Sequence, residues 1–349
     1  MWTRLILACA AAFSSACSVE RLRRFEYALP AMGTEFRIVL YALDQDLADA
    51  AAAAAFERIA ELDGKLSDYD PDSELVRLGL CSDGELPTDP IPVSDDLFAV
   101  LALALEVRDA SGGAFDVTAG PYVRLWRRAG RQGELPSRAR LEEASVSVGP
   151  RGLELDPAAR TVRLRAPSMR LDLGGIAKGY AVDRAFEILE ECGIESALVA
   201  GAGDIRLGHA PPGREGWEIG LAELGAGDSP TAAPLCLELA DAAISTSGDL
   251  ERYFELEGKR YSHVIDPRTG WALEERRLVT VIAGNGAQAD ALATAVCVLD
   301  AEDGIQLVER IPGARARVTE LRGDRREVFR SAAFPATKRC SLTSTGEER

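Results

Sequence analysis

Alternating apolar and polar positions predict strands and helices along most of the chain. Residues 25–41 have the composition of a strand that is interrupted at 30–34. Residues 46–62 form an alanine-rich segment that predicts a helix. Ser94 is a suitable N-cap for another helix, which we expect to run to about Ala110. The first third of the chain is therefore expected to mix both kinds of element.

Glycine-rich bends divide the second half of the chain into further elements. Residues 171–173 are predicted to be a strand, and the helix after them is expected to end at Gly193, because glycine readily adopts the left-handed conformation of helix ends. Residues 198–208 predict two strands joined by a bend, and 278–283 predict a buried strand. The segment 127–140 is rich in glycine and arginine and is predicted to be a surface loop.

Composition limits the classes of partner. The chain has 349 residues, of which 47% are apolar and 28% are charged, so it is long enough for one large domain or two ordinary ones with a sizeable core. The net charge of -16 argues against nucleic acid or an anionic membrane as the main partner. An anionic small ligand stays open, because a cation or backbone amides can neutralise phosphate locally.

The N-terminus predicts an export signal over residues 1–17. Arg4 is followed by the short apolar run 5–13 and then by small residues before Cys17. This run is too short to span a bilayer core of about 30 Å as a helix. Cys17 resembles the lipidated cysteine of bacterial lipoproteins, although Ser14 stands where leucine is usual; plain signal-peptidase cleavage is the alternative. We expect an exported protein on the periplasmic side, lipid-anchored at Cys17.

The cysteines of the mature chain do not form a metal-binding or disulfide-rich pattern. Beyond the export segment they are Cys81, Cys192, Cys236, Cys297 and Cys340. They are odd in number, widely spaced and without a C-x-x-C pair, which argues against a zinc site or a disulfide framework. Cys192 and Cys297 fall in apolar helical patterns and are predicted to be core residues. One disulfide stays open, with no pairing indicated. Residues 333–349 are predicted to be a disordered tail.

His263, one of only two histidines, is a candidate general base. Residues 260–265 alternate as a half-buried strand does, and the Asp-Pro-x-x-Gly sequence at 266–270 then predicts a tight turn. An imidazole at a strand end beside a carboxylate can be held in one tautomer, and histidine ordinarily has a pKa of about 6.5. A lone histidine is more often a packed or surface residue, so its role depends on the rest of the chain.

Two further segments carry candidate chemistry, each with a plain structural alternative. The loop at 172–179 has glycines, a helix start and Lys178, which are the parts of a phosphate cradle, although it fits neither common nucleotide-binding fingerprint. Ordinary strand-to-helix packing explains it equally well. Asp290 and Thr294 are four residues apart on one helical face, and their hard oxygens suit Mg²⁺. The alternative is an aspartate that favours the helix dipole and a packed threonine.

The order of these segments is more specific than any one of them. The series is AMGT at 31–34, LSDY at 66–69 with SE at 73–74, AFDVTAGP at 114–121, DLGGIAKGY at 172–180, GD at 203–204, STSGD at 245–249, HVIDPRTG at 263–270 and ADALATA at 289–295. Together they resemble the ApbE family of FAD:protein FMN transferases. The resemblance covers roughly residues 28–330.

The resemblance implies an α+β fold, with one large domain over residues 25–332 that consists of two related α+β subdomains and binds FAD between them. It implies Mg²⁺-dependent transfer of FMN from FAD to a threonine or serine hydroxyl of an exported or membrane-bound acceptor protein, with release of AMP. His263 would be the catalytic base, and Asp290, Thr294 and the main-chain carbonyl of Ala177 would bind Mg²⁺. The residues expected to line the FAD site, with the aromatic ones against the flavin or adenine, are Met32, Tyr69, Ala114, Phe115, Asp116, Lys178, Ser247 and Asp266.

Two departures from the family pattern and two alternative functions accompany this expectation. Residues 200–204 begin with alanine where the family often has asparagine, and Ser262 stands where a histidine is often found. Hydrolysis of FAD to FMN and AMP would need the same residues. A flavin-binding lipoprotein without catalysis would not need His263, Asp290 and Thr294 together. The chain has no Ser/Thr-Gly-Ala-Thr acceptor motif, so we expect the acceptor to be another protein.

Overall fold

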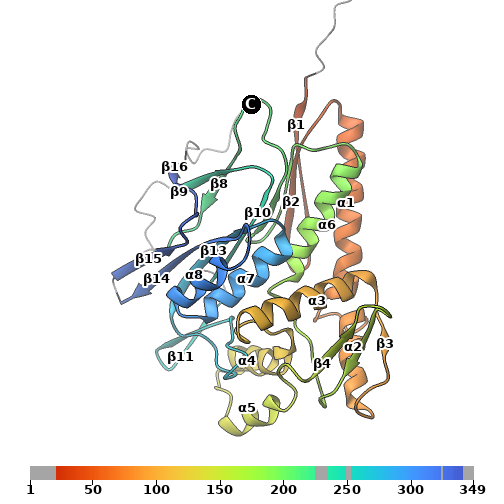
Figure 1. Ribbon diagram of the computed structural model, residues 1–349, viewed down its shortest axis with the longest axis vertical. Helices are drawn as coiled ribbons and strands as arrows, with labels where there is room; N and C mark the ends of the chain where they lie inside the picture. The colour runs from red at the N-terminus through yellow and green to blue at the C-terminus, as the bar shows by residue number, and fades with distance from the viewer. Residues whose placement is uncertain (1–20, 225–234, 249–252, 324, 341–349) are drawn as a thin grey trace, which may run out of the picture.

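The computed structural model describes residues 21–224, 235–248, 253–323 and 325–340 (Figure 1). The expected signal peptide at 1–17, with Cys17, lies outside the described residues, as does Asp249 of the STSGD segment. The disordered tail expected from residue 333 does not begin there. Strand β16 (Lys338–Arg339) pairs with β9 (Leu235–Leu239), and Cys340 forms a disulfide with Cys236. The sequence did not indicate this anchoring, because a two-residue strand and one long-range disulfide leave no local pattern.

An eight-stranded antiparallel sheet organises the fold, and its strands lie side by side in chain order. They are β1 (Arg23–Ala31), β2 (Thr34–Ala42), β6 (Ala197–Gly201), β7 (Asp204–Leu207), β10 (Ala242–Gly248), β13 (Arg276–Ala283), β14 (Arg315–Arg322) and β15 (Arg325–Arg330). The two middle strands of this sheet are β7 and β10, and β10 and β13 are labelled near its centre in Figure 1.

Helices cover one face of this sheet. They are α1 (Gln45–Leu66), α6 (Ala177–Glu191), α7 (Gly286–Val298) and α8 (Ala301–Glu309). Helix α1 begins at Asp44, whose side chain accepts a hydrogen bond from Leu47 N, and it buries Ala48, Ala51 and Ala55 at helical spacing. Small side chains let α1 pack closely on α6, and α6 in turn packs on α7. The main hydrophobic core lies between these helices and the sheet.

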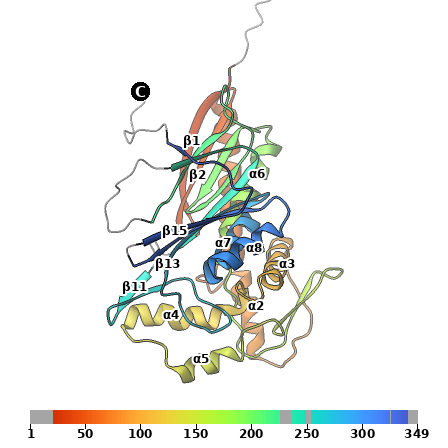
Figure 2. The ribbon, with the colours of Figure 1, turned by 60° about the vertical axis from the view of Figure 1, so that its left-hand side comes forward.

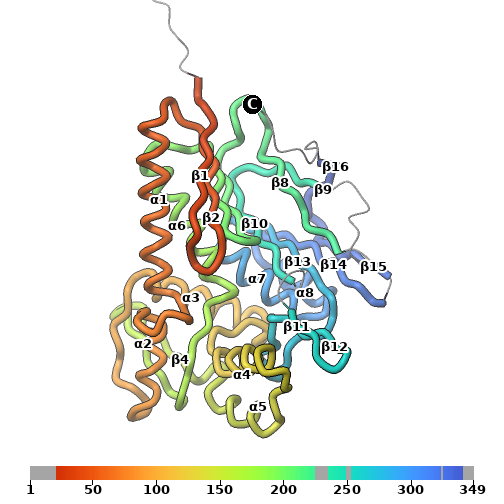
Figure 3. The backbone as a smooth tube through the Cα atoms, turned by 180° about the vertical axis from the view of Figure 1, so that it is seen from behind, coloured from red at the N-terminus to blue at the C-terminus, as the bar shows by residue number. Residues whose placement is uncertain are grey.

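A three-stranded sheet covers part of the opposite face (Figure 3). It consists of β8 (Trp217–Leu221), β9 and β16. Alternation puts Val39 and Ile244 of the main sheet on this side, where they meet Trp217 and Ile219 in a second core. The disulfide therefore fastens the last described strand to a sheet that is already packed on the main one.

Smaller elements form the lower part of the molecule in Figures 1 and 2, where α4 lies beside the β11–β12 hairpin. They are α2 (Glu74–Leu80), η1 (Cys81–Asp83), β3 (Ile91–Pro92), α3 (Asp95–Ala110), η2 (Val117–Ala119), α4 (Gly120–Gln132), α5 (Arg138–Ser145), β4 (Leu153–Asp156), β5 (Thr161–Leu164), β11 (Tyr253–Leu256) and β12 (Lys259–Ser262). Trp126 of α4 packs against Phe254 and Tyr261 of the hairpin, with ring centroids 6.2 and 5.3 Å apart.

The α+β class is confirmed, and several local expectations are corrected. The segment 127–140 is not a loop, because α4 and α5 occupy most of it. Residues 171–173 are not a strand but an extended approach to α6. Cys192 is exposed, because it follows the last turn of α6, whereas Cys297 is buried as predicted. Within the described residues, no helix combines the length and apolar character needed to cross a bilayer.

Candidate functional site

Two buried carboxylates and a lysine meet where the middle of the sheet faces α6 and α7. We call Lys178, Asp204 and Asp290 the acidic cluster. Asp204 begins β7 and Asp290 lies in the second turn of α7, and both are almost fully buried, at 3% and 2% exposure. Lys178 Nζ lies 3.6 Å from Asp204 Oδ2 and 3.8 Å from Asp290 Oδ2. One cation therefore faces two acids in a site with little water.

Close packing of α6 on α7 positions Asp290. A Cβ atom at Gly179 would lie 2.2 Å from the carbonyl oxygen of Gly286, so only glycine fits there. Because the helices approach so closely, Gly179 N donates a hydrogen bond to Asp290 Oδ2 at 3.2 Å. Asp183 of α6 accepts hydrogen bonds from Gly286 N and Ala287 N, at 2.7 and 3.0 Å, and so caps the start of α7.

Electrostatics in the acidic cluster favour an added cation. Burial and, after it, the neighbouring charge of Asp204 raise the pKa of Asp290 to about 7, against the opposing effect of Lys178. Burial also raises the pKa of Asp204, while Lys178 and the hydroxyl of Ser245 act against this. Ser245 Oγ donates to Asp204 Oδ1 at 2.6 Å. The two carboxylates repel each other, and a bound divalent cation would relieve that repulsion.

Thr294 and Ala177 complete the expected metal-binding group. Thr294 lies one helical turn beyond Asp290, and its Oγ1 would be 2.7 Å from a Cβ at Gly175, so the hydroxyl reaches the glycine loop itself. Ala177 opens α6 directly after this loop, next to Lys178. Carboxylate, hydroxyl and carbonyl oxygens are the donors that Mg²⁺ prefers. The residues present therefore fit a Mg²⁺ ion, with Asp204 as a further acidic neighbour.

Tyr69 has an exposed aromatic ring that Arg127 links to Asp172, just before the glycine loop. At 76% exposure it is the most exposed of the large hydrophobic residues in the part of the chain that the structure describes. The guanidinium carbon of Arg127 lies 4.4 Å from the centroid of the ring. Arg127 also pairs with Asp68 and, through Nη2 at 3.1 Å, with Asp172 Oδ2. Burial, together with the charge of Asp68, raises the pKa of Asp172, although Arg127 opposes this.

In the segment Ala114–Asp116, the aromatic ring of Phe115 is buried, although the sequence analysis expected it to line the FAD site. Ala114 and Phe115 are buried in the main core, so the Phe115 ring packs inside the protein. Of the two expected aromatic residues, only Tyr69 has an exposed ring. Asp116 Oδ1 accepts hydrogen bonds from Thr118 N and Thr118 Oγ1, at 2.8 and 2.7 Å, and burial raises the pKa of its carboxyl group.

His263 is exposed directly after β12, on a backbone that is held on both sides. Ser262 N donates to Leu273 O at 2.8 Å, and Leu273 N donates to Val264 O at 3.0 Å. Ser262 and Val264 point inward, so strand alternation turns the imidazole outward. His263 therefore lies at the end of a strand, as the sequence analysis predicts, and its role as a base stays a prediction.

The turn after His263 is tied to the Ala114–Asp116 segment. Asp266 carboxylate oxygens accept two hydrogen bonds from the Arg268 guanidinium at 2.9 Å, which fixes the turn. Gly270 has φ +75° and lies against the ring of Tyr122, which would be 2.7 Å from a Cβ there, so the turn requires glycine. Arg268 Cγ would contact a Cβ at Gly113 at 3.7 Å. The histidine-bearing turn thus packs beside the AFD segment.

A cavity of about 590 Å³ opens between these two segments. Asp116 lines it from one side, and Pro267 and Arg268 line it from the other. From Asp116 a backbone contact leads to the glycine loop, because Asp172 N donates to Val117 O at 2.8 Å. The cavity, Tyr69, the glycine loop and the acidic cluster are therefore joined by a continuous set of contacts.

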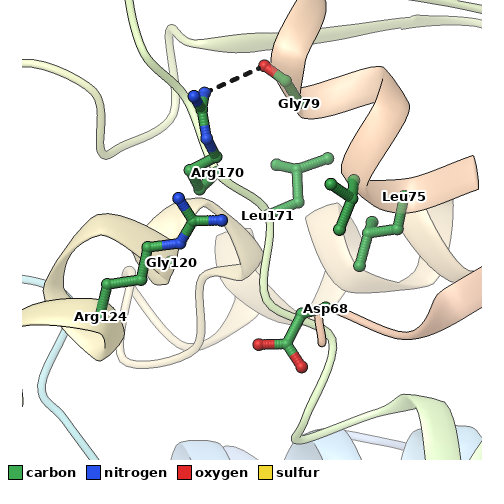
Figure 4. Close-up of a pocket in the computed structure, with 8 residues that line it drawn as sticks. Asp68, Leu75, Gly79, Gly120, Arg124, Arg170 and Leu171 are labelled. Carbon is green, nitrogen blue, oxygen red and sulfur yellow. Dashed lines mark hydrogen bonds between the residues drawn. The ribbon is translucent and has the colours of Figure 1, made fainter. Parts of the chain in front are cut away.

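A second, much smaller cavity lies beside Asp68 (Figure 4). Its volume is about 10 Å³, which is room for no more than one water molecule. Arg170 Nη1 donates to Gly79 O at 3.4 Å across its edge, as the dashed line shows. This cavity is part of the packing between α2 and α4 and is too small to bind a nucleotide.

The remaining expected FAD residues lie at turns or on a strand. Met32 occupies the β1–β2 turn with φ +48°, and its N donates to Asp63 Oδ2 at 3.1 Å. Ser247 is half-buried on β10, opposite Val279 of β13. Their part in FAD binding stays a prediction.

Asp204 and Asp172 are the residues that the sequence analysis did not place in the site. Both were present in the motif series, in the GD and DLGG segments, but neither was given a role. Each lies within two residues of a glycine at a bend. This position could have identified them from the sequence, because a glycine bend brings neighbouring side chains close to other backbone. Their burial with Lys178 and Arg127 became evident only from the packing.

The chain is similar to known proteins over most of its length. The chain is 32% identical to a protein of Treponema pallidum named FAD:protein FMN transferase, over 90% of each chain. It is 30% identical to the protein of that name in Haemophilus influenzae, covering 87% and 89%. The solved flavin transferase ApbE from Vibrio cholerae superimposes with a TM-score of 0.79 at 28% identity, covering 90% of this chain and 98% of that one. The ApbE protein of Thermotoga maritima gives 0.75 at 31% identity, covering 89% and 97%.

The family model described as "ApbE family" matches residues 32–318, which is most of the chain. All the segments discussed above, from the Met32 turn to Thr294, fall within this match. The chain therefore belongs to the ApbE family.

Proposed function

We propose that this FAD:protein FMN transferase moves FMN from FAD to a threonine or serine hydroxyl of another exported protein, in a Mg²⁺-dependent reaction that releases AMP. The observation that carries the proposal is the acidic cluster, in which two buried carboxylates face one lysine. Asp290, Thr294 and the carbonyl of Ala177 would hold Mg²⁺, which when bound neutralises charge on the diphosphate.

The chain's own residues supply binding and proton transfer. His263 accepts the proton of the acceptor hydroxyl, and the hydroxyl oxygen forms a bond to the phosphorus of the FMN half of FAD. The bond between this phosphorus and the bridging oxygen breaks, and the bridging oxygen leaves with AMP. Lys178 Nζ lies 2.9 Å from Gly174 O in the glycine loop. Its positive charge can offset the repulsion between the diphosphate and the carboxylates of Asp204 and Asp290.

We propose the FAD site along the contacts that join Tyr69, Asp116, Asp172, the glycine loop and the turn at Asp266. The ring of Tyr69 would stack on the flavin or adenine, and the 590 Å³ cavity beside Asp116 would take one end of the dinucleotide. The protein is further proposed to be exported and anchored through a lipid on Cys17; loss of membrane association in Cys17→Ser would support this, and unchanged partitioning would contradict it.

The proposal is tested by incubating the protein with FAD and Mg²⁺, with and without a threonine-bearing acceptor protein, and following AMP by chromatography and the acceptor by mass. AMP together with an FMN adduct, only in the presence of acceptor, is the expected result. AMP and free FMN without acceptor would instead indicate FAD hydrolysis, and absence of AMP in both would indicate a flavin binder. His263→Ala should abolish transfer and leave FAD bound, because the exposed imidazole contributes to no described core.

A further inference from the structure

Arg127 of α4 joins segments that are distant in the sequence but adjacent in the site. Its Nη1 pairs with Asp68 Oδ2, and its Nη2 lies 3.1 Å from Asp172 Oδ2. The guanidinium carbon also lies 4.4 Å from the centroid of the Tyr69 ring. Both carboxylates are largely buried, at 18% and 14% side-chain exposure, so these are not freely solvated surface pairs.

Each partner of Arg127 leads to a different part of the proposed FAD site. Asp68 precedes Tyr69 directly, so its position fixes the backbone from which the ring projects. Asp172 Oδ1 accepts a hydrogen bond from Gly174 N at 2.8 Å, and its backbone N binds Val117 O. One guanidinium therefore holds the Tyr69 loop against the glycine loop and the segment after Asp116.

Without Arg127 the Tyr69 ring would have little to hold it. The side chain is 76% exposed and lies outside the three hydrophobic clusters of the described residues. A mobile ring has to be ordered when a ligand stacks on it, and this ordering lowers affinity. Arg127 covers one face of the ring, which leaves the opposite face for a planar ligand.

We propose that Arg127 is a positioning residue for FAD, acting through Tyr69: by holding the Tyr69 loop and covering one face of the ring, it fixes the ring orientation on which the flavin or adenine stacks. The inference rests on the proposed function, because it takes FAD as the ligand of this site. Arg127 itself is not assigned to the chemistry of transfer.

The test compares Arg127→Ala with Arg128→Ala in the full chain. Arg128 is the next residue of α4, is exposed, and binds Gln132 of its own helix through Nε at 2.5 Å, so the control removes the same charge from the same helix. Arg127→Ala should raise the Kd for FAD and the KM about tenfold while kcat changes less than about twofold. Arg128→Ala should leave all three unchanged. Arg127→Lys keeps a charge but loses the flat guanidinium, so its effect should be intermediate.

A double-mutant cycle separates positioning from a general structural effect. In a Tyr69→Ala background, Arg127→Ala should not weaken FAD binding further, because its route of action is gone. An equal loss in both backgrounds, or an unchanged Kd in Arg127→Ala, would overturn the inference. Thermal unfolding of each variant identifies loss of folding, and Arg127→Lys keeps the test valid in that case. If the unaltered protein neither binds FAD nor releases AMP, the proposed function itself fails, which is a distinct outcome.

Discussion

Replacing Gly179 by alanine is expected to separate α6 from α7 and disturb the metal-binding residues. The added Cβ would lie 2.2 Å from Gly286 O and 2.7 Å from Asp290 Cβ, which is about 1.3 and 0.8 Å closer than an ordinary contact of about 3.5 Å. The carbonyl is backbone and cannot rotate away, so the helices must move. Overpacking of this kind costs roughly 1–3 kcal/mol. The higher helix propensity of alanine stabilises the folded state by at most about 1 kcal/mol.

We therefore expect Gly179→Ala to lower the free energy of unfolding by about 2 kcal/mol in urea titrations without Mg²⁺. Because Gly179 N also binds Asp290, the apparent Kd for Mg²⁺ should rise by roughly 10-fold or more, measured by calorimetry. Gly64→Ala in α1 is the matched control: a Cβ there meets nothing within 4 Å, so stability should rise by about 0.5–1 kcal/mol. Wild-type stability and Mg²⁺ affinity in Gly179→Ala would refute the close packing on which this reasoning depends.

Two further predictions concern regions outside the site. Replacing both Cys236 and Cys340 by serine should lower the free energy of unfolding by about 2–4 kcal/mol in urea titrations, because the bond closes a loop with a sequence separation of 104; an unchanged midpoint would exclude a stabilising role. The pKa of His209 is raised by its hydrogen bond with Asp241, 2.7 Å away, and by the charges of Asp241 and Glu195. Because the pKa of His209 is higher in the folded state, protonation of this histidine stabilises the folded protein. The stabilisation is complete below the unfolded pKa of about 6.5 and is lost as pH rises through the folded pKa. His209→Ala should therefore lower Tm at pH 5.5 more than at pH 8.5, and an equal decrease at both pH values would contradict this.

Elements whose ends carry local signals could be predicted from the sequence. The Ser94 side chain accepts from Leu97 N and starts α3 as expected, and Gly193 adopts φ +80° after α6. Helices α4 and α5 were missed because glycines were taken as breakers. Gly130 instead lies inside α4, where a Cβ would be 3.3 Å from the Phe254 ring, and Gly133 ends the helix at φ +67°. Whether a glycine breaks a helix or accommodates a neighbour depends on tertiary packing.

The same distinction applies to the site. Helical spacing was enough to put Asp290 and Thr294 on one face of a helix. It could not show that Asp204, from a strand end 86 residues before Asp290 in the sequence, shares the same buried space. Nor could it show that the Phe115 ring turns into the core while Tyr69 turns outward, because the direction of a loop side chain is set by what packs around it.

The bond between Cys236 and Cys340 also has a kinetic consequence if the chain is exported as proposed. Cys81 and Cys192 precede Cys236 in the chain, whereas its native partner follows Cys297 and comes last of the five. A chain that enters an oxidising compartment from its N-terminus therefore brings Cys236 together with wrong thiols before the right one. Wrong bonds are exchanged by thiolate attack over seconds to hours. Disulfide isomerisation after translocation would then add a slow step to the supply of mature enzyme.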